Sequence, residues 1–422
     1  MAVPLYLGLD FGTSGARACL IAGGGEIDRI EQVPFGALDD NDRARVWQAA
    51  LVTLIEQIPS ALRSRIAALA IDGTSGTILA CAAADARPLT PALMYDDARA
   101  VDESREIAAV AGADHPVVMP TSALAKARWL HAQGHMPRGA ILQHQADWLA
   151  ALLTGRVGFS DRHNALKLGF DPADGWPNWI DRVLPPETLP EVVLPGAALA
   201  SARGLLGKQL GLTSALVRAG TTDSIAAFLA TGVAAPGEAV SALGSTLAVK
   251  LVSPRRVDSA RYGVYSHWFG RYWLAGGASN AGGAVLRQFF TDAALAQLSA
   301  QIDPSQSSGL AYYPLPKIGE RFPEADPHKR PVLTPQPDDP LRFLHGLLEG
   351  LARIEAAGYR RLAELGAPPV RAVYSTGGGA ANSSYTRLRA RALGVPVFAA
   401  EQQAAAYGAA RLACFGEGVF PL

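Results

Sequence analysis

The sequence has no excess of charge of either sign. Its 38 Lys and Arg residues balance 38 Asp and Glu residues, so the formal net charge is zero. Binding to nucleic acid or to an anionic membrane depends on clustered Lys and Arg side chains that neutralise phosphate. We therefore expect neither partner, and a small ligand suits the composition better.

Cysteine is scarce, and long apolar runs are absent. Cys19, Cys81 and Cys414 are too few, and odd in number, for a disulfide framework, which favours a reducing compartment. No uncharged apolar run reaches the ~20 residues that a membrane-spanning helix needs. The first residues lack the basic stretch of an export signal and include Asp10. These features predict a cytoplasmic protein.

Several common catalytic motifs are also missing. The sequence has no Walker G-x-x-x-x-G-K-[ST] loop, no G-x-S-x-G elbow and no CxxC pair. Asp-Phe-Gly occurs, but the other protein-kinase motifs do not. His131 and His135 have helical spacing without the glutamate of a zinc motif, so we expect no metal there. Any phosphate binding must use a different loop design.

A chain of 422 residues is too long for one compact core, so two domains are expected. The strand, Gly-rich turn and strand around Asp10 to Leu20 predict a β-hairpin. A similar pattern around Glu238 to Val252 is a weak internal repeat. The repeat predicts a duplicated α/β domain, divided into residues 1–234 and 235–422, with phosphate contacts from both halves.

Other segments have clear periodicity. Apolar spacing predicts a helix from Arg43 to Ile58 and another that begins at Asp339-Pro340 and ends at Gly366. Between Ile302 and Pro340 the chain is rich in proline, so only short regular elements are expected there. A strand from Ala372 to Ser375 then leads into a glycine-rich turn and a final helix.

Three short segments contain candidate chemistry. Asp10 precedes Gly12, Thr13 and Ser14, whose backbone N–H groups can face an anion, although an ordinary hairpin turn is the alternative. Asp223 lies at the start of a predicted helix. Its carboxylate can act as a base, and the alternative is that it only caps the helix. The run Gly377-Gly378-Gly379 lets the backbone approach a flat ligand, although a loose turn explains it equally well.

Taken together, these segments resemble the FGGY family of carbohydrate kinases. In chain order they are DFGTSGARACL, GTTDSIAAFLATG, ALGST, GERFP, EGLARI and STGGGAAN. The similarity extends over nearly the whole chain. It implies two actin-like α/β domains, of the Hsp70 and hexokinase ATPase type, around a central cleft that binds ATP, with the sugar deep in the first domain.

The resemblance also implies roles for individual residues. Asp223 matches the catalytic base, and Asp10 matches an acid linked to Mg²⁺. Asp10, Ser75 and Asp223 are implied to contact the sugar. The residues implied to contact ATP are Gly12, Thr13, Ser14, Gly244, Ser245, Thr246, Gly377, Gly378, Gly379 and Asn382.

The resemblance further implies a substrate. The short chain and the segments IDGTSGTIL, NALKLGFD and AGTTDSIAAFLA are most similar to the D-ribulose kinase branch. Ser75 stands where xylulose kinases usually have a Met-His pair. The expected reaction is ATP-dependent phosphorylation of D-ribulose to D-ribulose 5-phosphate, with D-xylulose, another sugar or a polyol as alternatives.

Two other classes of protein compete with this interpretation. One is an ATP-driven switch related to actin or Hsp70, and the other is a sugar-binding transcription regulator. The first would need a peptide-binding domain and the second a helix-turn-helix arm. The kinase-like motifs occupy the chain from residue 6 nearly to its end, so we expect an enzyme. Its partners are a sugar and ATP, and the oligomeric state stays open.

Overall fold

The computed structural model describes residues 3–36 and 43–421, which divide into two compact units. Unit 1 comprises residues 1–232 and 402–420, and unit 2 comprises residues 233–401 and 421–422. The expected division, after residue 234, assigned the whole C-terminal part of the chain to the second domain. In the structure, residues 402–420 belong to unit 1 instead. These residues include helix α13 (Ala405–Phe415).

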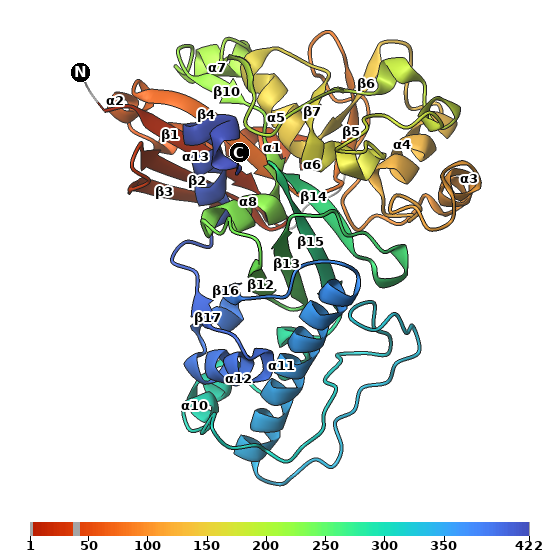
Figure 1. The fold of residues 1–422 in the computed structure, drawn as a ribbon. Coiled ribbons are helices and arrows are strands. Elements are labelled where there is room, and N and C mark those ends of the chain that lie inside the picture. Colours follow the sequence, from red (N-terminus) through yellow and green to blue (C-terminus); the bar gives the residue numbers. More distant parts are fainter. Residues whose placement is uncertain (1–2, 37–42, 422) are drawn as a thin grey trace. The chain divides into compact units, whose positions relative to one another are not determined.

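A mixed sheet forms the centre of unit 1, with the strand order β3-β2-β1-β4-β10-β9 and with β11 beside the end of β4 (Figure 1). The first two strands form the predicted hairpin and β3 extends it to an antiparallel meander, while β1 and β4 run parallel. The bounds are β1 Leu5–Phe11, β2 Gly15–Ala22, β3 Ile27–Pro34, β4 Ile66–Gly73, β9 Ala198–Ser201, β10 Leu216–Arg218 and β11 Thr221–Thr222.

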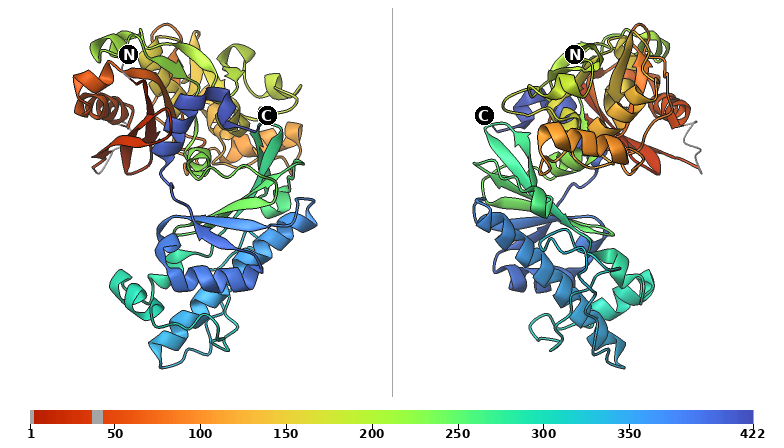
Figure 2. Two further views of the ribbon diagram at one scale, coloured as in Figure 1. Left: turned by 60° about the vertical axis from the view of Figure 1, so that its left-hand side comes forward. Right: turned by 90° about the vertical axis from the view of Figure 1, so that its right-hand side faces the viewer.

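Helix α13 lies against the first strands of unit 1, so the blue end of the chain is beside the red end (Figure 2). A Cβ atom on Gly8 would lie 2.0 Å from the Ala406 carbonyl oxygen, and one on Gly408 would lie 1.8 Å from that of Ala226 in α8 (Asp223–Ala230). Glycine at both positions removes these clashes. The close packing explains why α13 belongs to unit 1.

The remaining elements of unit 1 surround this sheet. Two small sheets pair β5 with β6 and β7 with β8. The bounds of the strands are β5 Ile78–Ala82, β6 Ala140–His144, β7 Phe159–Asp161 and β8 Glu191–Val193. The helices are α1 Arg43–Gln57, α2 Ser60–Arg63, α3 Val101–Ala111, α4 Ala123–Ala132, α5 Gln145–Thr154, α6 Arg162–Ala165 and α7 Leu205–Gln209.

Unit 2 repeats the arrangement of unit 1. Its sheet has the order β14-β15-β13-β12-β16-β17, in which β12 and β13 form the second predicted hairpin and β12 pairs parallel with β16. The internal repeat in the sequence is thus a repeat of strand order. The bounds are β12 Glu238–Leu243, β13 Leu247–Ser253, β14 Tyr265–Phe269, β15 Tyr272–Ser279, β16 Ala372–Thr376 and β17 Val397–Ala399.

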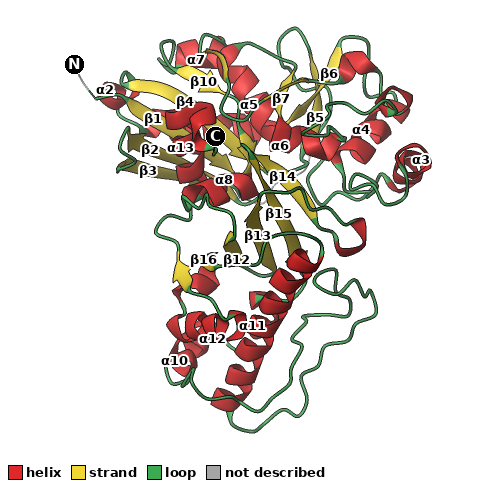
Figure 3. Ribbon diagram, viewed as in Figure 1, coloured by secondary structure: helices red, strands yellow, loops and turns green. Residues whose placement is uncertain are grey.

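Helices and a long loop segment complete unit 2. The helices are α9 Gly283–Leu286, α10 Asp292–Ser299, α11 Pro340–Glu364 and α12 Ser383–Leu393. The proline-rich segment between α10 and α11 lacks helices and longer strands over its described residues, as predicted (Figure 3). The side chain of Asp339 accepts a hydrogen bond from Leu341 N and caps α11. Within the described ranges, no helix has the length and apolarity that crossing a membrane requires.

A buried ion pair links two helices to the sheet of unit 2. The Arg389 guanidinium donates to both carboxylate oxygens of Glu355, at 2.5 and 2.7 Å, and both side chains are fully buried. Arg389 also donates to Ser375 Oγ at 2.6 Å, and Ser241 Oγ donates to Glu355 Oε1 at 2.5 Å. These bonds connect α11 and α12 to β12 and β16.

Replacing Arg389 should destabilise the protein strongly. Arg389→Met leaves the Glu355 carboxylate buried without its cation, which costs about 3–5 kcal/mol. Urea unfolding measures this loss. Arg360→Met, at an exposed position of α11, is the control and should change the unfolding free energy by no more than about 0.5 kcal/mol. Equal effects of both substitutions would contradict the prediction.

Candidate active site

Two acidic residues lie side by side where parallel strands of unit 1 end. Asp10 of β1 is the register partner of Asp72 of β4, and Thr221 of β11 is the partner of Asp72 on the other side. Side chains of register partners point to the same face of a parallel sheet. The pairing therefore brings the Asp10 and Asp72 carboxyl groups together and joins them to the strand that precedes Asp223.

Asp72 is in an unusual environment for a carboxyl group. The residue is fully buried, and its carboxyl oxygens have no partner among the described residues except the Asp10 carboxyl group, with which they can share one proton. Burial raises the pKa of Asp72 well above its usual range, and the charges of Asp10 and Asp223 raise it further. A buried polar group with unmet hydrogen bonds is costly, so this position is suited to a polar ligand.

Asp10 is also buried, but a cation lies near it. Burial raises the pKa of Asp10, while a hydrogen bond with Asp72 and the charge of Arg17 oppose that rise, with Arg17 Nη1 3.8 Å from Asp10 Oδ2. Among the described residues, no group of three or more His, Cys, Asp or Glu side chains could hold a metal ion. The Asp10 carboxylate is a hard oxygen donor of the kind Mg²⁺ prefers, and it fits an ion that keeps most of its water and phosphate ligands.

Asp223 is the first residue of α8, and Thr222 before it is the N-cap. The interpretation of Asp223 as the N-cap is therefore wrong by one residue. Its Oδ1 accepts a hydrogen bond from Ser224 N at 2.7 Å, and the side chain is only partly buried. The charge of Asp223 raises the pKa of Asp72, and it adds to burial and Asp96 in raising that of Tyr95. Asp223 thus lies near both residues.

A buried polar network holds the strand before Asp223. Asp161 caps the short helix α6 through the backbone N–H groups of His163 and Asn164. The ring of His163 shares a 2.7 Å hydrogen bond, through Nδ1, with Thr221 Oγ1 in β11. This network fixes β11 and hence the start of α8.

Ser75 lies in a tight turn directly after β4. Thr77 N donates to Thr74 O at 3.2 Å, and Gly76 has φ +85°, which suits glycine at the third position of the turn. The Ser75 hydroxyl is buried and has no hydrogen-bond partner among the described residues. Its side chain therefore does not stabilise the turn, which weakens the interpretation of Ser75 as a turn residue only.

The first glycine loop closes the β1–β2 hairpin. Gly12 N donates to Gly15 O at 3.0 Å, and the side chains of Thr13 and Ser14 between them are exposed. The loop begins next to Asp10, so the structure groups it with Asp72 in unit 1. This exposed turn suits contact with an anion.

The second glycine loop, in unit 2, is supported by a segment that sequence reasoning missed. Gly283 N donates to Gly244 O at 2.8 Å, and Ala284 N donates to Ser245 O at 3.1 Å. A Cβ atom on Gly282 would lie 2.6 Å from both Ser245 O and Thr246 Cα. The residues after β15 thus pack directly on the turn of the β12–β13 hairpin.

The third glycine loop lies beside the second one in unit 2. A Cβ atom on Gly377 would lie 2.8 Å from the carbonyl oxygen of Leu243, the last residue of β12. Asn382 Oδ1 accepts from Tyr385 N and caps α12, and its Nδ2 donates to Ser299 Oγ at 2.8 Å. Asn382 therefore holds the end of this loop, and Gly377 and Gly378 are its exposed glycines.

The predicted residues thus form one group in each unit. Asp10, the first glycine loop, Ser75 and Asp223 gather at strand ends of unit 1, and the other two loops gather in unit 2. Asp72 is the residue that sequence reasoning missed. A signal was available, since Asp72 and Asp10 each end a buried strand and each precede the letters GTSG.

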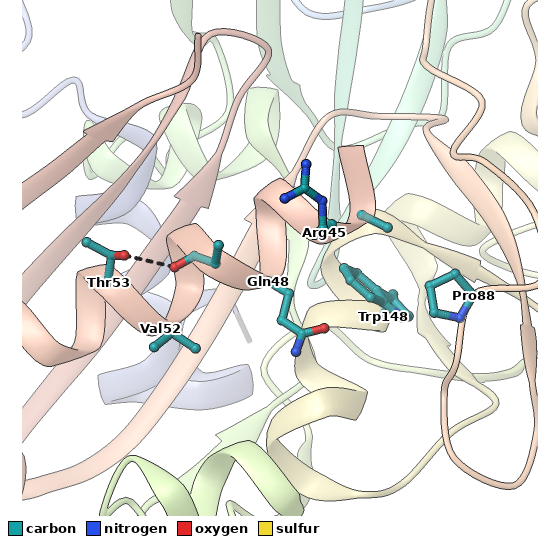
Figure 4. A pocket seen from close by; sticks show the side chains of 8 residues that line it. Arg45, Gln48, Val52, Thr53, Pro88 and Trp148 are labelled. Atoms are coloured by element: carbon teal, nitrogen blue, oxygen red, sulfur yellow. Dashed lines mark hydrogen bonds between the residues drawn. The ribbon is translucent and has the colours of Figure 1, made fainter. Parts of the chain in front are cut away.

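A groove of about 520 Å³ lies elsewhere in unit 1 (Figure 4). The Trp148 indole is buried at its wall and donates to Ala86 O at 2.8 Å. No predicted site residue contributes to the lining, which consists of Ala44, Arg45, Gln48, Ala49, Val52, Thr53, Pro88 and Trp148. The groove is therefore separate from the strand-end residues.

The repeated sheets and their glycine loops define a two-domain, actin-like fold. Solved structures agree with this fold. A structure described as a xyloylose kinase from Brucella ovis has a TM-score of 0.85 at 22% identity, covering 98% of this chain and 90% of that one. Plasmodium falciparum glycerol kinase with ADP has a TM-score of 0.86 at 15% identity, covering 100% and 91%. The predicted fold class is confirmed.

Related sequences are carbohydrate kinases by name. Residues 239–417 match the model of the FGGY family of carbohydrate kinases, C-terminal domain. Xylulose kinase of Streptomyces coelicolor is 29% identical over 273 residues, which cover 60% of this chain but only 55% of that protein. Xylulose kinase of Bacillus subtilis is 24% identical over 449 residues, covering 98% and 88%. The chain is thus similar to FGGY carbohydrate kinases, as its motifs predict, and the family model covers its C-terminal part.

Enlarging Gly282 should weaken nucleotide binding specifically. The new methyl group of Gly282→Ala would displace the second glycine loop, so we expect the KM for ATP to rise by about 10-fold or more. A displacement of ~1 Å at a binding loop can have effects of this size. Gly418→Ala is the control, because a Cβ atom there meets nothing within 4 Å.

Steady-state kinetics at saturating sugar separate the two variants. An unchanged KM for ATP in a folded Gly282→Ala protein would contradict a role of this loop in nucleotide binding.

Proposed function

We propose that the chain phosphorylates a pentulose with ATP and that D-ribulose is the preferred substrate, giving D-ribulose 5-phosphate. The observation that carries the proposal is the group of Asp72, Ser75 and Asp223. The buried Ser75 hydroxyl has no partner among the described residues, the buried Asp72 carboxyl group has only that of Asp10, and the Asp223 carboxylate is partly exposed. Sugar hydroxyl groups are partners of the required kind. Carboxylates next to them favour a neutral polyhydroxy substrate.

In the proposed mechanism, Asp223 is the general base. It accepts the proton of the primary sugar hydroxyl as that oxygen attacks the γ-phosphorus of ATP, and ADP leaves on the opposite side. Asp10 and Ser75 hold sugar hydroxyl groups, and Asp72 supplies a further polar contact. Most of the catalysis in such a reaction comes from positioning and charge stabilisation.

The glycine loops are proposed to bind the nucleotide. Backbone N–H groups around Thr13 and Ser245 contact phosphate oxygens, and the open backbone at Gly378 accepts the adenosine. Asp10 is the residue that would hold Mg²⁺, largely through water, and the ion supplies positive charge for the phosphate oxygens. A cytoplasmic location is part of the proposal, supported by the three free cysteines.

D-xylulose is the second candidate substrate. Two relatives of this chain are named xylulose kinase, and the two pentuloses differ only in configuration at C3. Ser75 is the observation that favours D-ribulose. A panel of ketoses, aldoses and polyols, assayed by ATP consumption, tests the proposal directly. Turnover of a non-pentulose alone would overturn it.

Asp223→Asn should remove most of the activity and keep the fold. The amide retains an oxygen that can accept from Ser224 N but cannot take up a proton, and loss of a general base costs roughly 10²–10⁴-fold in kcat. Asp292→Asn is the matched control, because Asp292 is likewise the first residue of an eight-residue helix.

Initial rates at saturating sugar and ATP, with circular dichroism of both variants, measure the effect. A folded Asp223→Asn protein that binds the sugar and turns over near the wild-type rate would rule Asp223 out as the base.

The choice between the two pentuloses should depend on Ser75. We expect a higher kcat/KM for D-ribulose than for D-xylulose in the wild type. In Ser75→Ala, the KM for D-ribulose should rise by about 5-fold or more and exceed the rise for D-xylulose, since one buried hydrogen bond contributes about 1–3 kcal/mol. Stability should stay unchanged, because the Ser75 hydroxyl makes no hydrogen bond that the substitution removes.

Steady-state kinetics on both sugars decide this point. An equal or higher kcat/KM for D-xylulose in the wild type would favour the second candidate and leave the kinase assignment intact.

A further inference from the structure

Lys126 is a fully buried lysine in the middle of α4. Its Nζ donates to Gly76 O at 2.8 Å and to Met94 O at 2.6 Å. Neither bond involves a carboxylate, so the ammonium group is used to hold two backbone carbonyl groups that are distant in sequence.

The two carbonyl groups belong to segments next to the candidate sugar site. Gly76 follows Ser75 in the turn after β4. Met94 precedes Tyr95, whose raised pKa reflects burial first and then the nearby charges of Asp96 and Asp223. The same segments are joined by a β-bridge, in which Ile78 and Leu93 exchange backbone hydrogen bonds at 2.8 and 3.1 Å. Lys126 adds a second link between the same two segments, at Gly76 and Met94, which is closer to Ser75 than the Ile78–Leu93 bridge is in sequence.

Burying the ammonium group of Lys126 costs desolvation free energy, and the packing around it does not require a charged side chain. The neighbouring residues on α4, Leu124, Ala127 and Leu130 among them, belong to an apolar cluster that an uncharged side chain would fill equally well. Burial lowers the pKa of Lys126 to about 8, and the charges of Asp97 and Asp96 oppose that change. The hydrogen bonds of Lys126 to the Gly76 and Met94 carbonyl groups are what this buried cation contributes.

We propose that Lys126 is a positioning residue for the sugar. By holding the Gly76 and Met94 carbonyl groups together, it fixes Ser75 and Tyr95 relative to each other and so sets the affinity for the sugar, without contacting it. The inference rests on the proposed function for the location of the sugar site. Its effect is expected on sugar binding, since the nucleotide loops receive no hydrogen bond from Lys126.

The substitution Lys126→Met tests the proposal because methionine has a similar shape and no donor. We expect the KM for the sugar to rise by about 10-fold or more, with the KM for ATP changed less than about twofold. Lys126→Arg, which keeps the charge and the donors, should restore part of the sugar affinity. If Lys126→Met does not fold, Lys126→Leu replaces it, because leucine also lacks a donor and suits the surrounding apolar cluster.

Arg353→Met is a control for the loss of two such hydrogen bonds, at an exposed position far from the candidate sugar site in sequence. Arg353 Nη2 also donates to two carbonyl oxygens, those of Leu310 at 3.0 Å and Tyr312 at 3.2 Å, within unit 2. Its loss should lower the melting temperature and leave the KM for the sugar unchanged. This comparison separates a general loss of stability from a specific effect on the sugar.

Three outcomes would overturn the proposal: an unchanged sugar KM in a folded Lys126→Met or Lys126→Leu protein, an equal rise in both KM values, or no recovery with arginine. Failure of the proposed function is a separate result, because the wild type would then phosphorylate neither pentulose. In that case the best substrate of the sugar panel serves for the same comparison of KM values.

Discussion

The parallel pairing of β1 with β4 is the constraint on which the candidate site depends. This pairing puts Asp10 beside Asp72 and, through β11, connects both to the start of α8 at Asp223. Carboxyl groups repel each other when charged, and burial makes each charge more costly. Such an arrangement is expensive for the free protein, which is typical of sites whose polar groups are completed by a ligand.

Close backbone approach is the second requirement of this fold. Gly8 and Gly408 allow α13 to pack on the first sheet and on α8, and Gly282 allows the chain after β15 to pack on the second glycine loop. Any side chain at these positions would collide with backbone, which cannot move as a flexible side chain can. The same type of contact therefore holds a whole helix in unit 1 and a single binding loop in unit 2.

Buried charges stabilise the two units in different ways. In unit 2, Arg389 and Glu355 neutralise each other and connect two helices to the sheet. In unit 1, Lys126 holds backbone carbonyl groups near the candidate sugar site. The first is a structural pair whose charges compensate. The second is a cation whose hydrogen bonds go to carbonyl groups and whose charge is balanced only through the nearby Asp96 and Asp97. It positions the two loop segments that it joins.

The sequence by itself determined the local elements and the order of the motifs. The two hairpins, the long helix that begins at Pro340 and the irregular proline-rich segment follow from hydrophobic period, glycine turns and an N-cap, which are short-range effects. Only the tertiary structure decided that α13 packs on the first unit, that Asp72 is a neighbour of Asp10, and that Lys126 connects Gly76 to Met94. These contacts join residues far apart in the chain, and neither periodicity nor turn chemistry specifies which distant partner a strand or a buried cation will meet.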